Sequence, residues 1–245
     1  MKRLREKLLV LAFIYMAALT LLPANQAIPV AGDDWKIPDV GMEFVWISDL
    51  DCWVGKYEVT NGEYRKFKPD HDSGSYESKS LNGDRQPVAF VTCEDASEYA
   101  KWLTGREQQA GRLPAGYRYR LPSGNEWTKF CLCGDNRLYP WGDQMPPKYG
   151  NYSGREAGGQ WGRIAGYNDG FPVSCPVEQS GMNEWGLYGV GGNVWECTVK
   201  QGTDTLEGWR GASWGNNLPV SMQSLCLIAN FAAFRYGGFR LILAR

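Results

Sequence analysis

The feature that most restricts the fold of this chain is a long stretch with almost no regular structure. From Tyr139 to Glu196, Gly, Asn, Asp and Pro recur every few residues, which is typical of turns and loops. A loop of this length inside a compact domain needs a metal, disulfides or a function to hold it. The chain also has 30 glycines and 11 tryptophans, which provide left-handed backbone positions and large apolar side chains. We therefore expect a compact domain with little regular secondary structure.

The first 32 residues are predicted to be a secretory signal peptide. A basic segment, MKRLREK, precedes an apolar run from Leu8 to Leu22, and small residues for cleavage follow near Ala27 and Gly32. The apolar run is roughly 15 residues long, below the ~20 needed to span a bilayer, so an uncleaved anchor is the weaker interpretation. We expect one mature domain over residues 33–245, secreted or periplasmic, with no membrane contact beyond the signal peptide.

Charge and cysteine content exclude several classes of protein. The 26 basic and 27 acidic residues nearly balance, which argues against a nucleic acid or an anionic membrane as the main partner. Export permits disulfides, but the seven cysteines are an odd number, so at least one is free or pairs between chains. Cys131 and Cys133 are two residues apart, and their Cβ atoms diverge if the segment is helical or extended, so a mutual bridge is not expected. His71 is the only histidine, so a zinc site of mixed Cys and His ligands is not expected.

The regular elements that the sequence predicts are few and of both kinds. Residues 41–47 and 52–60 read as strands of a hairpin joined by SDLD, and a short helix begins near Thr60. The clearest helix follows Thr92, with Asp95 as the acidic residue of its capping box, and a further helix follows Ser123. A surface loop is expected over 71–86 and a terminal strand over 237–245. This mixture places the domain in the α+β class.

Eight segments taken in order resemble one known family. They are GKYEVTNGEYRKF, QPVAFVTCEDASEYAKWL, YRLPSGNEW, YPWGD, GYNDGF, GLYGVGGNVWEC, RGASW and GGFRL. Their sequence and spacing are similar to those of the formylglycine-generating enzyme (sulfatase-modifying factor) family, from Gly41 to Arg245. The resemblance implies a single α+β domain of low regular content with a C-type-lectin-like topology.

The resemblance also implies structural calcium at two places. The first site would use Asn151, Tyr152, Asp169 and Phe171, and the second would use Gly191, Gly192, Val194 and Glu196. Calcium takes six to eight oxygens, many of them backbone carbonyls that glycine-rich loops can turn toward one point. The alternative is that the two carboxylates cap turns or pair with an arginine. Asn151 also begins a glycosylation sequon, and a coordinating asparagine would not be free to carry a glycan.

The catalytic residues of the family are absent. Family enzymes convert a cysteine of a sulfatase client to formylglycine with O₂ and Cu(I), which two thiolates hold. The corresponding positions fall on Asn216 and Ser221, and Ser213 lies in the preceding turn. Asparagine and serine are hard, neutral ligands, so copper is not expected, and Ser213 without a histidine reads as a turn residue. The alternative is a surviving formylglycine-generating oxidase that uses Cys226 and another thiol.

The C-terminal stretch points to binding. Between residues 211 and 245 the only charged side chains are Arg235, Arg240 and Arg245, and many apolar residues fall in irregular sequence. Ile228, Ala229, Phe239, Leu241 and Leu243 read as core, whereas the others suggest an exposed patch of the kind that marks binding sites. The predicted ligand-binding residues are Trp214, Asn216, Leu218, Val220, Leu225, Leu227, Phe231, Phe234 and Tyr236.

This region also resembles the diversified surface of the variable proteins of diversity-generating retroelements. In those lectin-like proteins the variable segment lies between a GGSW-like turn and a GFR strand, as the segment between RGASW and GGFRL does here. Loops carry recognition in such proteins while the frame carries stability. We therefore predict a binding module that has lost oxidase activity and recognises an unknown protein or glycan.

Overall fold

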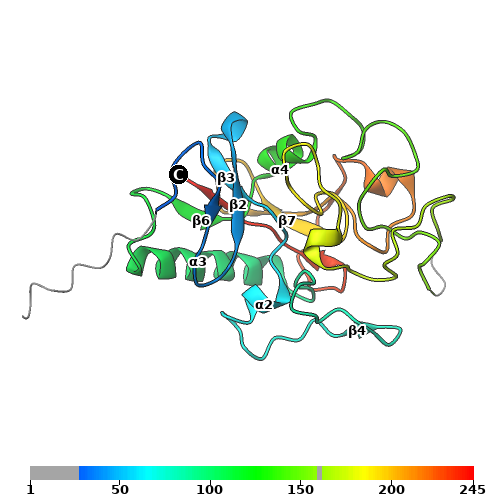
Figure 1. Ribbon diagram of the computed structural model, residues 1–245, viewed down its shortest axis with the longest axis horizontal. Helices are drawn as coiled ribbons and strands as arrows, with labels where there is room; N and C mark the ends of the chain where they lie inside the picture. Colours follow the sequence, from blue (N-terminus) through cyan, green and yellow to red (C-terminus); the bar gives the residue numbers. More distant parts are fainter. Residues whose placement is uncertain (1–27, 159–161) are drawn as a thin grey trace, which may run out of the picture.

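The computed structural model describes residues 28–158 and 162–245 (Figure 1). Residues 1–27 of the predicted signal peptide lie outside this part. The strands are β1 (Trp35–Lys36), β2 (Glu43–Ile47), β3 (Cys52–Gly55), β4 (Ser75–Tyr76), β5 (Lys79–Ser80), β6 (Arg118–Arg120), β7 (Trp195–Val199), β8 (Leu206–Arg210), β9 (Leu227–Ile228), β10 (Gly237–Gly238) and β11 (Ile242–Ala244). The helices are α2 (Asn61–Tyr64), α3 (Cys93–Gln109) and α4 (Gly124–Cys131), with short 3-10 turns η1 (Ser48–Leu50), η2 (Val177–Gln179) and η3 (Pro219–Met222).

The larger sheet places the C-terminal strand between strands from the first half of the chain. Its order is β1-β2-β3-β11-β6, and β11 is antiparallel to both of its neighbours. Leu243 lies opposite Trp53 of β3 and Tyr119 of β6, and it is fully buried. The β2–β3 hairpin turns through residues 48–51, as predicted. The predicted second strand is shorter than expected, because β3 ends at Gly55 rather than at Thr60.

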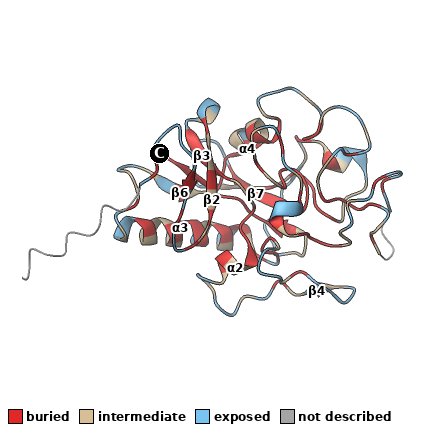
Figure 2. Cartoon of the chain, in the orientation of Figure 1, coloured by how far each residue is buried: buried red, intermediate tan, exposed pale blue. Residues whose placement is uncertain are grey.

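Helix α3 covers one side of the core (Figures 1 and 2). It begins where the sequence predicts, with a complete capping box between Thr92 and Asp95. Its buried residues Ala96, Tyr99 and Leu103 recur at helical spacing and face the main core, while the other face is exposed. A disulfide from Cys93 at its first turn to Cys197 of β7, with the Cα atoms 5.7 Å apart, ties the helix to the second sheet.

The second sheet has the order β10-β7-β8-β9, in which β10 runs parallel to β7. Helix α4 packs near this sheet and also begins with a capping box, formed by Ser123 and Glu126. Every residue of β7 is buried, so this strand forms the centre of the sheet. The short outer strand β9 carries Leu227 and Ile228, which are exposed, and Ala229 beyond it is exposed too. The prediction that Ile228 and Ala229 belong to the core is therefore wrong.

The long loop region is held by an aromatic core of its own. Tyr139 stacks on Trp141 at 4.8 Å between ring centroids, Trp141 meets Tyr152 at 5.3 Å, and Tyr152 meets Tyr167 at 6.1 Å. All four rings are buried. In the described part of residues 139–194, η2 is the only helical segment and no strand is present. Packing of large aromatic rings therefore stabilises this segment, as the high aromatic content allows.

The predicted surface loop over 71–86 is only partly exposed. It contains the β4–β5 hairpin, and Leu81 directly after it is fully buried. Asn61 at the start of α2 donates to the backbone carbonyls of Leu81 and Gly83, which fixes the loop to the domain. Within the described residues, no helix is both long enough and apolar enough to cross a membrane.

Candidate functional site

The two positions predicted to correspond to the family's copper cysteines, Asn216 and Ser221, are neighbours in space. The Asn216 side-chain amide donates to the Ser221 hydroxyl at 3.0 Å. The side-chain oxygen of Asn216, Oδ1, accepts from the Ser213 backbone N–H at 2.9 Å, from the Ser213 hydroxyl at 2.9 Å and from the Trp195 ring N–H at 3.1 Å. Ser213 thus supports a turn, as its lack of a histidine partner predicts. The geometry brings the two positions together, but both carry hard, neutral groups.

The remaining thiol of this region is not activated. Cys226 lies four residues beyond Met222 at the end of η3, and burial raises the pKa of its thiol. A reactive or copper-binding cysteine needs a thiolate, which nearby positive charge stabilises by lowering the pKa. Among the described residues, no cluster of three or more His, Cys, Asp or Glu side chains could hold a metal ion. The chemistry of these donors does not fit Cu(I).

A dense apolar patch covers the predicted recognition segment. Eleven large apolar side chains of the described residues are exposed, and six of them fall within residues 218–231. We call these six the apolar face; they are Leu218, Val220, Leu225, Leu227, Ile228 and Phe231. Scattered exposed apolar residues are normal, but such a concentration marks an interaction site.

The other predicted ligand-binding residues support this face from beneath. Trp214 is 2% exposed, so the prediction that it lies on the surface is wrong. It is covered by Tyr236, with ring centroids 4.6 Å apart, and by Tyr76 of β4 at 5.2 Å. Phe234 packs edge-on against Trp209 of β8 at 5.1 Å, and both Phe234 and Tyr236 are half-buried. Large aromatic rings therefore anchor the loop at both ends.

At the first predicted calcium site, two of the predicted residues bind the Asp169 carboxylate through their backbone. The backbone N–H groups of Tyr152 and Phe171 each donate to Asp169 at 2.9 Å. Next to Tyr152, the side-chain oxygen of Asn151 is buried and has no hydrogen-bond partner, and one carboxylate oxygen of Glu156 is in the same situation. Sequence reasoning did not find Glu156, which lies in an unpatterned loop. Unsatisfied buried oxygens of this kind are suitable ligands for a hard cation.

The electrostatics of this loop are consistent with a bound cation. Burial raises the pKa of Asp169 to about 7, and the nearby Glu156 raises it further, while the backbone N–H groups lower it. No lysine or arginine of the described residues forms a salt bridge with Asp169 or Glu156. Two neighbouring carboxylates without a positive partner suit calcium, which prefers oxygen ligands and adds the missing charge.

The carboxylate predicted for the second calcium site is already paired with an arginine. The Glu196 carboxylate accepts from the Arg240 guanidinium at 2.8 and 3.2 Å and from the Trp127 ring N–H at 2.8 Å. The Gly191 carbonyl accepts from the Tyr152 hydroxyl at 3.0 Å. Glu196 and Arg240 are both fully buried. The alternative prediction, that this carboxylate pairs with an arginine, therefore describes Glu196.

Another buried carboxylate near this pair is unpaired. Both oxygens of Glu58 are buried without a hydrogen-bond partner, against the backbone of Gly189. Burial raises the pKa of Glu58 to about 8, while the charge of Arg240 lowers it and that of Glu196 raises it. The sequence gives no sign that the Glu58 carboxylate is buried and unpaired, because Glu58 lies within an ordinary strand-like pattern.

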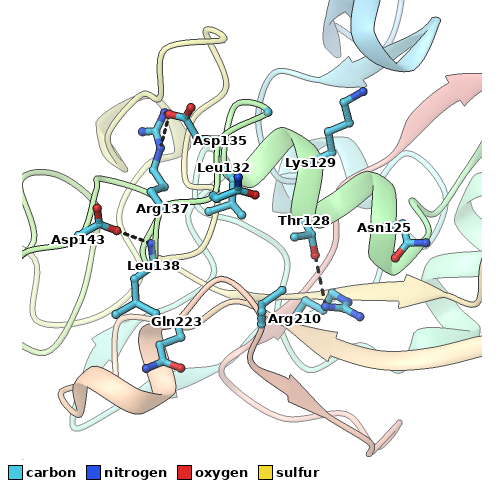
Figure 3. A pocket seen from close by; sticks show the side chains of 13 residues that line it. Asn125, Thr128, Lys129, Leu132, Asp135, Arg137, Leu138, Asp143, Arg210 and Gln223 are labelled. Atoms are coloured by element: carbon cyan, nitrogen blue, oxygen red, sulfur yellow. Dashed lines mark hydrogen bonds and ion pairs between the residues drawn. The ribbon is translucent and has the colours of Figure 1, made fainter.

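A cavity of about 590 Å³ is lined by 13 residues (Figure 3), one of which, Leu225, also belongs to the apolar face. Its walls come from α4, from the loop after it, from the end of β8 and from the segment after η3. The lining residues are Asn125, Thr128, Lys129, Leu132, Gly134, Asp135, Asn136, Arg137, Leu138, Asp143, Arg210, Gln223 and Leu225. Sequence reasoning identified only Leu225, because the four segments come together only through the tertiary fold.

The fold and these motifs define a lectin-like domain. Strands from the first half of the chain and the C-terminal strand β11 form its larger sheet, and its loops carry the candidate site. The chain belongs to the family described as the Sulfatase-modifying factor enzyme 1-like domain, whose model matches residues 39–244. The C-type-lectin-like fold expected from the motifs is thus confirmed.

Curated relatives resemble part of the chain. The formylglycine-generating enzymes of Mus musculus and Thermomonospora curvata are 36% and 35% identical to it over 123 and 133 residues. These matches cover 50% and 52% of this chain and 29% and 35% of the relatives. The inactive C-alpha-formylglycine-generating enzyme 2 of Bos taurus is 33% identical over 135 residues, covering 52% of this chain and 38% of the relative. The chain thus matches under two fifths of the length of each.

Two solved structures share the fold. PvdO from Pseudomonas aeruginosa aligns with a TM-score of 0.60 at 20% identity, covering 89% of this chain and 100% of that protein. Treponema denticola variable protein 1 aligns with a TM-score of 0.59 at 15% identity, covering 86% and 98%. At these identities the likeness concerns the fold alone.

Proposed function

We propose that this protein is an exported binding module of the sulfatase-modifying-factor family that has lost oxidase activity. Its apolar face, from Leu218 to Phe231, would recognise a partner protein. The observation that carries this proposal is the concentration of six exposed apolar side chains in a loop that aromatic rings anchor at both ends. A rigidly anchored loop loses little conformational entropy when it binds, so its exposed side chains contribute fully to affinity.

Loss of the oxidase is supported by the Asn216–Ser221 hydrogen bond, which replaces a thiolate pair by groups that do not bind Cu(I). That a relative of similar identity is named an inactive formylglycine-generating enzyme shows that inactive members occur in the family. A protein is favoured over a glycan as the partner, because the apolar face is mainly aliphatic and uncharged and offers few hydrogen bonds to sugar hydroxyl groups.

We further propose that calcium binds at Asn151, Tyr152, Asp169 and Phe171 as a structural ion, with Glu156 as a neighbouring carboxylate. The unsatisfied oxygens of Asn151 and Glu156 support this assignment. A bound ion would hold the loop that contacts the recognition segment. The contact is a hydrogen bond of 3.0 Å from the Ser153 backbone N–H to the Asn216 backbone carbonyl.

The first experiment is to sequence the codons for residues 209–245 across a clonal population and close isolates. Substitutions concentrated between Trp214 and Tyr236, with RGASW and GGFRL unchanged, would establish a diversified binder like the retroelement variable proteins. An invariant stretch would indicate a single partner. Binding itself is tested with a displayed peptide and protein library, in which selected binders must lose affinity for the Val220→Arg variant, whose side chain is 65% exposed. Binders unaffected by this variant would contradict the assignment of the face.

The second candidate is a formylglycine-generating oxidase, because several relatives are named as such enzymes. Copper-loaded protein incubated with O₂ and a peptide containing Cys-x-Pro-x-Arg should give no aldehyde product by mass spectrometry. A peptide aldehyde that depends on Cys226 would establish the oxidase and overturn the loss of activity.

A further inference from the structure

The cavity beside the apolar face has the size and position of a ligand site. Its volume of about 590 Å³ lies within the range of about 300–1,000 Å³ that is common for ligand pockets. Leu225, which is 72% exposed, belongs both to its wall and to the apolar face. Gln223 lies two residues earlier on the same segment (Figure 3). A ligand in the cavity would therefore be continuous with a partner on the face.

The charged groups of the cavity are already satisfied by the protein. Arg137 pairs with Asp135 at 2.9 Å and with Glu184 at 2.8 Å. Arg210 pairs with Glu207 at 3.0 Å and also donates to the Thr128 hydroxyl at 3.4 Å.

The last two charged groups are also engaged. Lys129 donates to the backbone carbonyl of Asp49 at 2.7 Å, and the Asp143 carboxylate accepts from the Leu138 backbone N–H at 2.7 Å. Four of the five charged side chains of the cavity lie in ion pairs, since Lys129 is also 3.8 Å from the Asp49 carboxylate. Asp143 is the one of the five that forms no salt bridge within the described residues. A strongly ionic ligand would therefore have to break existing pairs, and an anionic one would also meet the Asp143 carboxylate.

Three amide side chains line the cavity and are available to a ligand. Asn125, Asn136 and Gln223 make no side-chain hydrogen bond to any other described residue. A side-chain amide offers both donors and an acceptor, which matches the alternating N–H and C=O groups of an extended peptide backbone. The amides come from α4, from the loop after it and from the segment after η3.

The apolar part of the cavity consists of leucines. Leu132 is buried, whereas Leu138 and Leu225 are exposed, and all three line the same space. No aromatic side chain is among the lining residues. A pyranose ring usually stacks its C–H face on an aromatic ring, so a glycan lacks its usual platform here. An aliphatic side chain would instead bury its surface against the three leucines.

We propose that this cavity binds an uncharged, extended peptide segment of a partner protein, with one aliphatic side chain among Leu132, Leu138 and Leu225. The backbone of that segment pairs with the amides of Asn125, Asn136 and Gln223. This inference rests on the proposed protein-binding function and names the part of the partner that the protein recognises.

The test uses the capped peptide Ac-Gly-Ser-Leu-Ser-Gly-NH₂ and the full mature chain, with binding measured by saturation-transfer NMR. The comparison ligands are the same peptide with Glu in place of Leu and methyl α-glucopyranoside. Leu225→Arg places a charged side chain at the cavity wall. Met182→Arg is its matched control, because Met182 is 51% exposed and lies neither on the apolar face nor among the residues that line the cavity.

We expect saturable binding of the leucine peptide that Leu225→Arg weakens about tenfold or more, as the loss of one buried aliphatic contact implies. Met182→Arg should bind the peptide like the wild type. Absence of saturable binding, equal weakening by both variants, or preference for the glucoside or the glutamate peptide would overturn the proposal. Library binders that respond to Val220→Arg but not to Leu225→Arg would support the apolar face while excluding the cavity, so the two proposals fail separately.

Discussion

The side chains of Asn216 and Ser221, the two positions predicted to correspond to the family's copper-binding cysteines, are joined by a hydrogen bond of 3.0 Å. The side-chain oxygen of Asn216 at the same time accepts three hydrogen bonds, two from Ser213 and one from Trp195. The frame that would bring two thiolates together is thus retained, while its donors have become part of the structural hydrogen-bond network of the turn.

This relationship predicts that a copper site can be restored. The double variant Asn216→Cys with Ser221→Cys should bind one Cu(I) in competition with a chromophoric chelator, whereas the wild type should bind none, because soft thiolates select Cu(I). The single variant Asn216→Cys is the control and should bind much more weakly, since one thiolate is not enough. Tight binding of Cu(I) by the wild type would show that other thiols of the chain form the site.

Calcium should stabilise the protein through Asp169. Adding 1 mM Ca²⁺ to chelator-treated protein should raise Tm by several degrees, since a ligand at 100 times its Kd stabilises by about 2.7 kcal/mol. Asp169→Asn should abolish the shift, because it removes the carboxylate that the Tyr152 and Phe171 backbone groups hold in place. The matched control is Asp135→Asn, a surface carboxylate paired with Arg137, which should retain the full shift. An equal shift in all three proteins would exclude this site.

The buried carboxylate of Glu58 should make stability depend on pH. The folded protein holds the proton up to a pH of about 8, while the ordinary pKa of this side chain is 4.5. The folded state therefore binds more protons between these values, and the free energy of unfolding falls as the pH rises through this range. The slope from this one group approaches about 1.4 kcal/mol per pH unit.

The variant Glu58→Gln isolates this contribution. It should lack that part of the slope between pH 5 and 8 (the range set by the two pKa values) and should be relatively more stable at pH 9 than the wild type. Urea denaturation at several pH values measures the difference between the two proteins. Parallel pH profiles would mean that Glu58 is not protonated in the folded state.

The disulfide between Cys93 and Cys197 should contribute strongly to stability. It closes a loop across a sequence separation of 104 residues, so its removal in the double variant Cys93→Ala with Cys197→Ala should cost about 2–5 kcal/mol. Cys133→Ala is the control, because Cys133 is a free, half-buried cysteine. Denaturation under non-reducing conditions measures the free energy of unfolding of the double variant and of the control relative to the wild type. A cost no larger than that of the control would indicate that the two cysteines are reduced in the folded protein.

Local sequence signals predicted the elements with strong start signals. The capping boxes of Thr92 with Asp95 and of Ser123 with Glu126 located α3 and α4, since capping depends on residues three positions apart. The disulfide partner of Cys93 could not be predicted, because the spacing of cysteines does not reveal which chain segments meet in space. The same limit applies to Ile228 and Ala229, which have a core-like composition but lie at and beside the outer strand β9.

The sequence by itself determined the family and the presence of Asn216 and Ser221 where the motifs predict two thiols, because each depends on residue identity in a short window. Tertiary structure alone decided that Trp214 lies beneath the surface, that Arg240 neutralises Glu196, and that four separate segments enclose the cavity. Burial and charge pairing depend on contacts between residues far apart in the chain. A sequence lists the groups available for such contacts, and only the packed fold determines which of them meet.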